Sequence, residues 1–560
     1  MGAGGRKQTV EIIYEKIPPI ITYILILFPF WGGFVLPFAT AYFVIIFNVF
    51  FLYKSISFSV FFAVSLIKIR QTENINWLSR LEYLDTPKEA LEKLELKLEQ
   101  LEILSFADLK KDKRLPLFIR RYLFRRAKRK VTSFIKGEIS RIQRLKEQKL
   151  NFDWKELHHI VIIPHWKEPK HVLDHTLNTI KNSNYPTKRI SIVLGAEKRD
   201  STGLKISNEL KNKYKKHFEQ IWVTNHELTE DEIVGKSSNM AYAGKIAKKK
   251  IDKLGWDLKK VTVTSCDADS QLPRNYFANV AYNYVTMKDS IYKYFNAAVV
   301  LYANIWRLPF YARVKNSMSS IYNVGRLVRT DKLVPFSTYT TSFWLIDKIG
   351  YWTPTITPED FHIFFKGLFR FPTKVSTIPI YQKVMADAAE GETHLETIKN
   401  NYFQERRWSW GISDDGWLLR NVLKKVLSGD IKIAMLYRSL HVMFDHIIGP
   451  VSAIIILVGG NIPLLVNPSF AATTTGINLP RISSFMIQMT LWFLLVTILM
   501  DQYLKPKKPG KTNVIKKFFE LFEWIIQPFV GIILVAIPGI EAHTRLLFGK
   551  YLEYYLTKKK

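Results

Sequence analysis

The sequence is poor in cysteine and short of acidic residues. A single cysteine, Cys266, stands among 560 residues, which excludes a disulfide framework and any zinc or iron–sulfur site built from several cysteines. Asp and Glu number 49 against 81 Lys and Arg, a formal net charge of +32. That excess suits partners that carry phosphate, namely nucleic acid, anionic lipid or a nucleotide. Hydrophobic residues make up 48% of the chain, too many for an intrinsically disordered protein.

Charge is missing from a long run near the N-terminus. No charged residue occurs from Ile17 to Tyr53, and a membrane span needs about 20 apolar residues, so the run is long enough for nearly two spans. Two prolines and two glycines within residues 29–37 predict a tight reversal in its middle. Basic residues flank the run on both sides, which places both flanks in the cytoplasm. We therefore predict about two spans within residues 1–70.

The C-terminal region is also apolar. His446–Pro480 and Ile482–Met500 contain no Asp, Glu, Lys or Arg, and lysines follow from residue 505. By the positive-inside rule, the uncharged loop 467–480 lies outside and the lysines lie inside. A third segment, Trp524–Ile540, has 17 residues and two prolines, which leaves open whether it is a short span or a re-entrant segment. Residues 426–560 are predicted to form an interfacial helix followed by about three spans.

Residues 71–156 are predicted to be helical and strongly basic. Thr86-Pro87-Lys88-Glu89 has the form of a capped helix start. Residues 110–149 contain 16 basic and 3 acidic residues. A nucleic-acid reader would use such a patch, but no recognition-fold signature accompanies it. A basic face beside a membrane span more often rests on anionic headgroups, so we expect this segment at the cytoplasmic membrane surface.

From about residue 157 the pattern changes to alternating strands and helices. Apolar runs at residues 159–164, 190–194 and 261–264 predict buried strands, and residues 173–180 predict a helix between the first two. Such alternation favours a mostly parallel α/β sheet over residues 157–425, with its site at the carboxyl ends of the strands.

Carboxylates follow one of these strands in a pattern that suits a metal ion. In Asp267-Ala268-Asp269 the two outer side chains of an extended segment point the same way and can hold a divalent cation that also grips a diphosphate. Taken alone, two aspartates so spaced are more often loop solvation or a helix cap. Glu359-Asp360 adds a second carboxylate pair, and Gln404–Trp408 adds cations and an aromatic ring. Without a larger motif, Arg407 and Trp408 would suit a membrane interface.

The ordered set of motifs resembles the membrane-embedded glycosyltransferases of family 2, which include cellulose, chitin and hyaluronan synthases. The resemblance covers about Val161 to Trp408, with membrane spans on both sides. Its five blocks, in the family's order, are Val161–Pro164 with Glu168-Pro169, Gly235–Asn239, Asp267-Ala268-Asp269, Pro358-Glu359-Asp360, and Gln404 with Arg407-Trp408. The last block, Gln-x-x-Arg-Trp, is the most specific and is typical of processive members.

The resemblance implies an α/β fold with a glycosyltransferase A-type, Rossmann-like cytoplasmic domain flanked by transmembrane helices. It implies Mg²⁺ or Mn²⁺ as cofactor and a nucleotide-sugar donor, with a UDP-sugar favoured. The implied roles are a catalytic base at Asp360 beside Glu359; metal ligands at Asp267 and Asp269; donor contacts at Glu168, Glu197, Lys236, Asn239 and Asp267; and acceptor or diphosphate contacts at Gln404, Arg407 and Trp408.

The chain departs from the family pattern in two places. Members usually carry an aspartate pair just after the second strand, where Gly195-Ala196 stand here and Glu197 follows. Donor binding is then expected to use Glu197. Pro358 replaces the usual threonine of its block, and both acids that follow it are kept.

The function that these features favour is an inverting, metal-dependent transferase that elongates a polysaccharide at the cell membrane. One alternative is a single addition to a lipid or polyprenyl-phosphate acceptor. Another is a degenerate transferase that serves as a membrane scaffold, against which the intact motifs argue. Five spans are few for a self-contained export channel, which leaves a homo-oligomer open, and nucleic acid is the least favoured partner.

Overall fold

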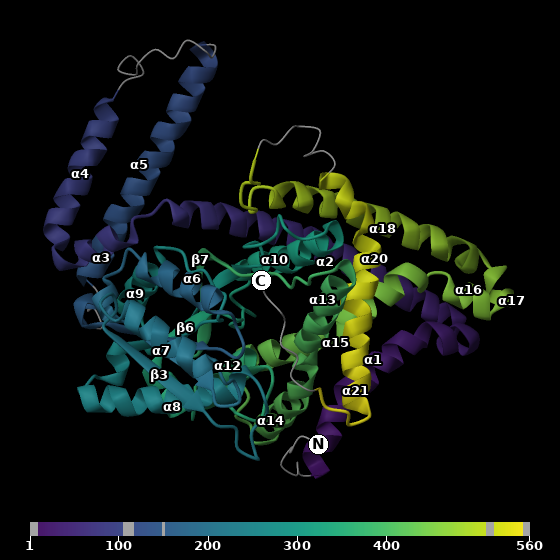
Figure 1. Cartoon of the computed structure of the whole chain (residues 1–560). Coiled ribbons are helices and arrows are strands. Elements are labelled where there is room, and N and C mark those ends of the chain that lie inside the picture. The colour runs from purple at the N-terminus through teal and green to yellow at the C-terminus, as the bar shows by residue number, and fades with distance from the viewer. Residues whose placement is uncertain (1–8, 105–116, 148–151, 511–519, 553–560) are drawn as a thin grey trace.

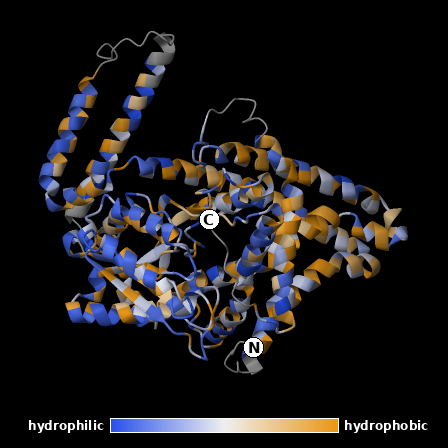
Figure 2. Cartoon of the chain, in the orientation of Figure 1, coloured by the Kyte–Doolittle hydropathy of each residue, from blue (hydrophilic) through white to orange (hydrophobic). Residues whose placement is uncertain are grey.

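The computed structural model describes residues 9–104, 117–147, 152–510 and 520–552. Within these residues the chain forms a domain built on one sheet, a group of long apolar helices beside it, and a helical hairpin that projects from the domain (Figure 1). Figure 2 shows that apolar residues concentrate on the long helices and in the interior of the sheet domain.

The sheet has seven strands in the order β3-β2-β1-β4-β6-β5-β7. Six strands run the same way, and β6 is antiparallel to both β4 and β5. The strands are β1 (His158–Pro164), β2 (Ile190–Glu197), β3 (Gln220–His226), β4 (Val261–Ser265), β5 (Lys293–Val300), β6 (Tyr339–Ser342) and β7 (Ser376–Met385). The predicted mostly parallel α/β sheet is confirmed, with one antiparallel strand that the sequence did not indicate.

Helices cover both faces of the sheet, because alternate residues of each strand point to opposite faces. Val161 and Ile163 pack in a cluster with α6 (Lys170–Lys181), α7 (Gly203–Tyr214) and α9 (Tyr276–Thr286). Ile160 and Ile162 pack in a second cluster with α8 (Lys236–Leu254), α11 (Phe343–Lys348) and α12 (Glu359–Arg370). Burial on both faces accounts for the continuous apolar runs by which these strands were recognised.

The strand order reverses beside β1, and this reversal positions the site. From β1 the chain proceeds to β2 and β3 on one side, and then returns to place β4 on the other side. Ligand crevices in open α/β sheets form at the carboxyl ends of strands that flank such a switch point. Residues 165–169 leave β1 there, and residues 266–269 leave β4.

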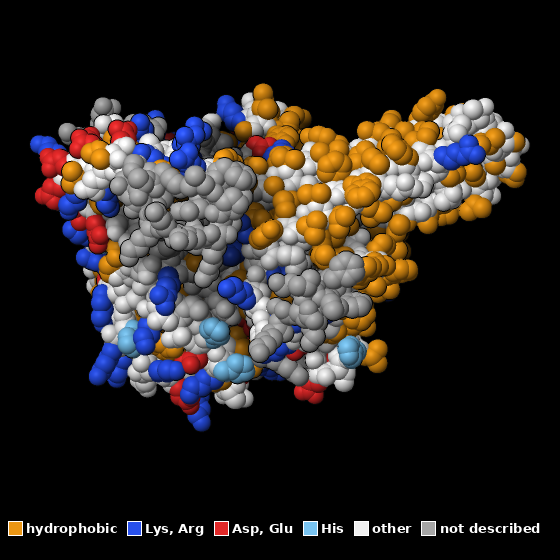
Figure 3. Space-filling view, turned by 90° about the horizontal axis from the view of Figure 1, so that it is seen from above, with side chains coloured by type: hydrophobic (Ala, Val, Ile, Leu, Met, Phe, Trp, Pro, Cys, Tyr) orange, Lys and Arg blue, Asp and Glu red, His pale blue; other side chains and the backbone are white. Residues whose placement is uncertain are grey.

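Five helices are long and apolar enough to cross a membrane within the part of the chain that the structure describes. They are Glu11–Val35, Pro37–Glu73, Ile433–Val458, Thr474–Asp501 and Glu520–Leu547. Figure 3 shows apolar side chains gathered over one end of the molecule, with charged side chains over the other. Polar pairs such as Asn48 with Ser483 (3.2 Å) and Ser59 with Thr497 (2.8 Å) join the helices in the apolar region.

The first two long helices form where the sequence predicts two spans. α1 (Thr9–Val35) and α2 (Pro37–Glu73) are separated only by Leu36, so the reversal falls at the predicted prolines and glycines. Near the other end, α15 (Ile433–Val458) leads through α16 (Ile462–Val466) and α17 (Pro468–Ala471) to α18 (Thr474–Asp501). The loop predicted over residues 467–480 is therefore shorter, since α18 begins at Thr474 and contains Pro480.

The last apolar segment takes a different course. It passes from a 3₁₀ turn (Glu523–Ile526) through α20 (Gln527–Gly531) and a π-helical turn (Ile532–Ala536) to α21 (Ile537–Leu547), and its prolines stand at the starts of α20 and α21. Figure 1 shows α20 and α21 running across the direction of α2 and α18. Glu541 of α21 bonds to Arg406 (2.6 Å) and Tyr402 (2.8 Å) of α13 (His394–Ser409), which joins this helix to the sheet domain.

The basic region forms a helical hairpin. After α3 (Trp77–Asp85), α4 (Pro87–Ile103) packs along α5 (Leu117–Glu147), with Leu94 buried against Ile135 and Ile142. The helix start predicted at Thr86 is confirmed, although the Thr86 side chain makes no capping bond there. Residues 105–116 and 148–151, which hold the two ends of the basic stretch 110–149, lie outside the described residues, as do residues 511–519 of the later lysine run.

Two further helices fasten the sheet domain to the long helices. In α10 (Phe310–Gly325), a Cβ added at Gly325 would lie 2.6 Å from the Phe58 ring of α2, so glycine permits this close approach. Arg420 of α14 (Asp415–Leu427) pairs with Glu11 of α1.

The crossing course of α20 and α21 predicts that they do not carry the chain through the membrane. We expect Lys507→Cys and Lys550→Cys to react with an impermeant maleimide from the same side, and Ser469→Cys to react from the opposite side. All three positions are exposed, whereas the native Cys266 is buried and gives little background. Labelling in sealed vesicles of both orientations measures the sides, and Lys550→Cys reacting together with Ser469→Cys would contradict this topology.

Candidate functional site

A partly buried lysine, whose side chain is 16% exposed, joins carboxylates from two distant sequence blocks. Lys236, the first residue of α8, places its Nζ 2.6 Å from Oδ1 of Asp267 and 3.0 Å from Oε1 of Glu359. Asp267 follows β4, and Glu359 is the first residue of α12. The cluster therefore lies at the carboxyl end of β4, beside the switch point of the sheet.

Ser337, in the loop before β6, links this cluster to Asp360. Its backbone carbonyl accepts a bond from Lys236 Nζ (3.2 Å), and its hydroxyl donates to Oδ2 of Asp267. Its backbone N–H donates to Oδ2 of Asp360 (3.0 Å), whose Oδ1 accepts from the N–H of Phe361 (2.9 Å). Ser337 holds a left-handed backbone with φ of 57°, an unfavourable conformation for a side-chain-bearing residue that tends to persist at functional sites.

Charge and burial oppose one another in this cluster. Burial by itself lowers the pKa of the Lys236 ammonium, but Asp267 and Glu359 outweigh it and raise that pKa well above its usual value. Burial raises the pKa of the Glu359 carboxyl, and the nearby charge of Asp360 adds to the effect, while Lys236 opposes it. The ammonium is therefore firmly charged, and the carboxylates depend on it for neutralisation.

Asp269 occupies a separate position beside Asp267. Its Oδ2 accepts a bond from the backbone N–H of Asp387 (2.9 Å), in the segment that follows β7. Within the described residues, no three His, Cys, Asp or Glu side chains come together as a ready-made metal cage. Mg²⁺ commonly uses one or two carboxylates together with substrate phosphates rather than such a cage, so the oxygens of Asp267 and Asp269 fit Mg²⁺ or the similarly hard Mn²⁺.

The Gln-x-x-Arg-Trp motif gathers around a second buried lysine. Lys315 of α10 is fully buried, and its Nζ lies 3.1 Å from Glu405 and 3.3 Å from Gln404 Oε1. The same ammonium stands 4.2 Å from the centre of the Trp408 ring. Burial lowers the pKa of Lys315, against the attraction of Glu405. A cation in this environment orients the motif, and Arg407 follows one turn after Gln404 on the same helix.

α13 also holds the segment that positions Asp269. Asn401 donates to the carbonyl of Ala389 (3.0 Å), and Asn400 donates to the carbonyl of Glu390 (3.1 Å). Asp387, in the same short segment, supplies the N–H bonded to Asp269. Gln404 and Trp408 continue the face of Asn400 at intervals of four residues. The motif is thus connected to the carboxylates through residues 387–390.

The expected donor-binding acids lie in a third group at the ends of β1 and β2. Glu197, the last residue of β2, pairs with Arg199, whose guanidinium stands 4.0 Å from the centre of the Trp166 ring. Glu168 accepts from the backbone N–H of Trp166. Asp200, which sequence reasoning did not select, is buried and accepts from the backbone N–H groups of Lys167 (2.8 Å) and Thr202 (3.0 Å).

Gly195, one of the positions at which the chain departs from the family pattern, has no room for a side chain. A Cβ added there would lie 2.6 Å from Oδ1 of Asn239, a distance that side-chain carbons do not tolerate. Asn239, from the first turn of α8, donates its Nδ2 to the Gly195 carbonyl at 2.8 Å. The Asn239 amide therefore fills the space that a side chain at position 195 would need.

The predicted residues thus fall into three adjoining groups. Lys236, Asp267, Glu359 and Asp360 come together directly or through Ser337; Gln404 and Trp408 share Lys315; and Glu168 and Glu197 both lie beside Trp166. Sequence reasoning missed Lys315, Ser337 and Asp200. Only Asp200 had a usable signal, because an aspartate before Ser-Thr-Gly suits a helix start. A lone serine and a lone lysine carry none.

Comparison with known proteins finds likeness in structure only. No family model matches the chain, and no curated protein matches its sequence. One similar solved structure is a mannosyltransferase from Pyrobaculum calidifontis in complex with GDP-Man and Mn²⁺, 13% identical, with a TM-score of 0.38 over 65% of this chain and 93% of that chain. TarS from S. aureus is 8% identical, with a TM-score of 0.30 over 64% of this chain and 57% of that one. Because these TM-scores are below 0.5, function has to be inferred from the site itself.

Removal of the Lys236 charge is expected to lower the stability of the fold, and by an amount that depends on pH. Lys236→Met should destabilise the fold by about 3 kcal/mol, the lower end of the range for a fully buried pair, since it leaves the buried Glu359 and the partly exposed Asp267 without their partner. The folded-state pKa of Glu359 is already raised and should rise further without the lysine, so stability is lost as pH rises through it. The fall in Tm in detergent should therefore grow as the pH rises above the ordinary pKa of a glutamate, about 4.3.

The matched control for this prediction lies on the same helix. Lys248→Met removes a surface pair with Asp252 (2.7 Å) and should change Tm little at any pH. Lys236→Arg, which keeps the charge, should recover part of the loss. Equal, pH-independent shifts in the Met variants at positions 236 and 248 would contradict the described role of Lys236.

Proposed function

We propose that the protein is an inverting, metal-dependent glycosyltransferase of the A-type fold, similar to the processive family 2 synthases. In this proposal it transfers a sugar from a nucleotide diphosphate donor to a growing polysaccharide at the membrane. Residues 157–425 form the catalytic domain, residues 1–70 and 426–560 the membrane regions, and residues 71–156 a basic cytoplasmic segment. The catalytic domain faces the cytoplasm, where sugar nucleotides are made.

The observation that carries the proposal is the convergence of three of the five motif blocks on one point. Lys236, Asp267 and Glu359 are in direct contact, and Asp360 is one hydrogen-bonded residue away. These residues span 125 positions of the chain (236 to 360). Loop solvation or helix capping would explain each acid singly, but neither accounts for a shared buried cation.

The residues of this cluster suit the steps of sugar transfer. An acceptor hydroxyl attacks the anomeric carbon from the face opposite the diphosphate, the bond to the diphosphate oxygen breaks, and the configuration inverts. Asp360 takes the proton of the attacking hydroxyl as general base. Lys236 and Arg407 are suited to the charge that develops on the leaving diphosphate. Glu359, paired with Lys236, holds that ammonium in place.

A divalent cation bound by Asp267 and Asp269 would stabilise the leaving diphosphate as a Lewis acid. The chain's own contribution is to hold both carboxylates in place. Lys236 and Ser337 hold Asp267, and the Asp387 amide holds Asp269. In this proposal Glu168, Glu197 and Asn239 contact the nucleotide of the donor, and Gln404 and Trp408 contact the acceptor.

The function predicts turnover that depends on both metal and donor. Purified protein should hydrolyse or transfer from one member of a panel of UDP- and GDP-sugars when Mg²⁺ or Mn²⁺ is added, and EDTA should abolish this activity. Asp269→Ala should lose transfer and bind the donor more weakly in the presence of metal, because the diphosphate charge is less well screened. A ladder of products would support processivity, and a single product would favour the lipid-linked acceptor.

Exposed acids offer a matched control for Asp269. Asp252→Ala, on the surface of α8, should retain full transfer, since its carboxylate is exposed and pairs with Lys248 of the same helix. Near-normal turnover by Asp269→Ala with the correct donor would reject the metal role of the motif.

If Asp360 is the general base, its replacement should lower turnover without weakening donor binding. Asp360→Asn keeps the size of the side chain and one of its two acceptor oxygens but cannot take up a proton. Donor affinity should stay within a few-fold while transfer falls by at least ~10². Glu359→Gln should cost less, because Asp267 still pairs with Lys236.

Measurement of donor Kd and single-turnover rate for both variants tests this assignment. If the two acids only cap α12, Asp360→Asn would barely change the rate, since asparagine is also a good capping residue. If donor binding and turnover are lost together, Asp360 instead belongs to the metal or nucleotide site.

A further inference from the structure

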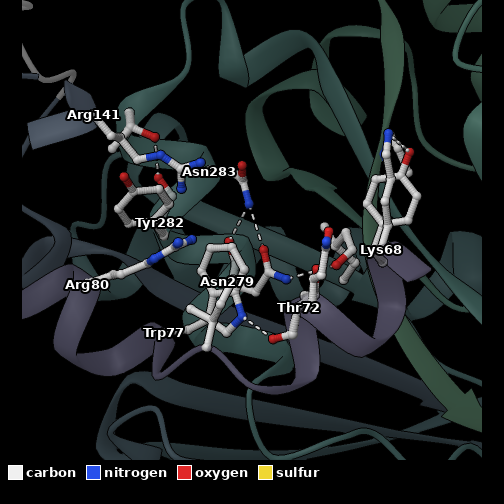
Figure 4. A pocket seen from close by; sticks show the side chains of 14 residues that line it. Lys68, Thr72, Trp77, Arg80, Arg141, Asn279, Tyr282 and Asn283 are labelled. Carbon is white, nitrogen blue, oxygen red and sulfur yellow. Dashed lines mark hydrogen bonds between the residues drawn. The ribbon is translucent and has the colours of Figure 1, made fainter. Parts of the chain in front are cut away.

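An open pocket lies away from the carboxylate cluster, where the end of α2 meets the sheet domain. It has a volume of about 520 Å³ and is lined by the last turns of α2, by α3, α5 and α9, and by the middle of β7. Figure 4 shows its labelled side chains, among them Lys68, Arg80, Arg141, Tyr282 and Asn283, arranged around one space. This volume is within the usual range for small-molecule sites.

Three cations line this cavity and one carboxylate opposes them. Arg80 is only 6% exposed, and its Nε has no hydrogen-bond partner within the described residues. Its guanidinium pairs with Glu138, which lies 3.9 Å from Arg141 as well. Burial, helped by the like charge of Arg141, lowers the pKa of Arg80 in spite of Glu138. With Lys68 also on the wall, the pocket has an excess of positive charge, of which Arg80 is buried and Lys68 and Arg141 are open to solvent.

Fixed amide groups form another side of the cavity. Asn283 donates Nδ2 to the Asn279 backbone carbonyl (2.9 Å) and to its side-chain oxygen (2.7 Å). Asn279 in turn donates to the carbonyl of Ile380 in β7 (2.9 Å). Figure 4 shows the side-chain oxygen of Asn283 turned away from Asn279. These bonds hold a polar group in one orientation before any ligand arrives, which lowers the cost of binding.

The wall formed by β7 is irregular in a way that builds the cavity. The pairing with β5 shifts between Asn296 and Ala298, so that residues 380–382 bulge opposite one residue of β5. Tyr381, in this bulge, has φ of 46°, and its hydroxyl accepts a bond from Lys68 Nζ (3.1 Å). Bulges and left-handed non-glycine residues tend to occur at functional sites, where surrounding contacts maintain them.

We propose that this cavity binds a water-soluble phosphate ester of sugar-phosphate or nucleotide size. Phosphate oxygens match the arginine and lysine groups, and hydroxyl or ring nitrogen groups of the ester match the amides and the tyrosines. The proposal is independent of the proposed transferase function, because the cavity shares no residue with the carboxylate cluster.

The position of Lys68 favours a soluble ligand over a lipid headgroup. Lys68 is 31 residues (68 − 37) beyond the start of α2, which is about 46 Å along the helix axis at 1.5 Å per residue. The hydrocarbon core is only ~30 Å thick, and each headgroup layer adds several ångströms. The cavity therefore lies on the water side of the headgroups when α2 crosses the membrane from its N-terminal end.

Titration calorimetry with inorganic pyrophosphate tests the proposal on the full-length protein in detergent. EDTA is present throughout, so that a diphosphate cannot bind through a metal at Asp267 and Asp269. We expect saturable binding at one site, which an excess of a nucleoside monophosphate displaces. Lys68→Gln and Arg141→Gln should each weaken the affinity about tenfold, since each removes a charge-assisted contact.

Controls separate this site from general attraction to a basic protein. Lys211→Gln, at an exposed lysine of α7, removes the same charge elsewhere and should leave the affinity unchanged. Asp269→Ala should also bind pyrophosphate normally in EDTA, so a failed transferase assignment would not affect the result. Both cavity variants are at partly exposed positions and are expected to keep the Tm of the parent.

Three results would overturn the proposal. The first is no saturable binding of pyrophosphate by the parent protein. The second is binding that Lys211→Gln weakens as much as Arg141→Gln does. The third is binding displaced by vesicles of phosphatidylglycerol but not by the nucleoside monophosphate, which would assign the cavity to a lipid headgroup.

Discussion

The buried ammonium of Lys236 is the interaction on which the arrangement of the site depends. It brings together the start of α8, the segment after β4, the loop before β6 and the start of α12. Without a cation between them, the charges of Asp267 and Glu359 would repel each other. One charge thus stabilises the arrangement of four segments.

The same site is fastened to the membrane helices through α13. One side of this helix holds residues 387–390, whose Asp387 amide orients Asp269. Another part binds Glu541 of α21 through Arg406 and Tyr402. Gln404 and Trp408 stand between these attachments, ordered by Lys315. In the proposed function, a polysaccharide that leaves the carboxylates along α13 would meet α21 directly.

Buried cations recur in this strongly basic chain, and their surroundings differ. Lys236 has two carboxylate partners, whereas Lys315 has Glu405 and an aromatic ring, and Arg80 shares Glu138 with Arg141. A cation whose charge is neutralised by protein carboxylates needs no further partner. A cation that is incompletely neutralised is stabilised when an anion binds from solution. This difference distinguishes the cavity at the end of α2 from the two lysine clusters.

Much of this protein could be predicted from its sequence, because the signals are local. Continuous apolar runs identified three of the seven strands, β1, β2 and β4, and the long helices. Proline and glycine located the turn at Leu36, and the spacing of acids after β4 selected Asp267 and Asp269. Only the tertiary structure shows that β6 is antiparallel and that α20 and α21 run across the direction of α2 and α18. Only the tertiary structure shows, too, that the site residues gather in three groups, around Trp166, Lys236 and Lys315. These features depend on contacts between residues that are distant in the chain, such as Lys315 with Gln404 (89 positions apart) and Tyr402 with Glu541 (139 positions apart). A lone lysine or serine carries no mark of the partner it will meet. Gly195 shows the same limit, since its lack of a side chain is explained only by the Asn239 amide that packs against it.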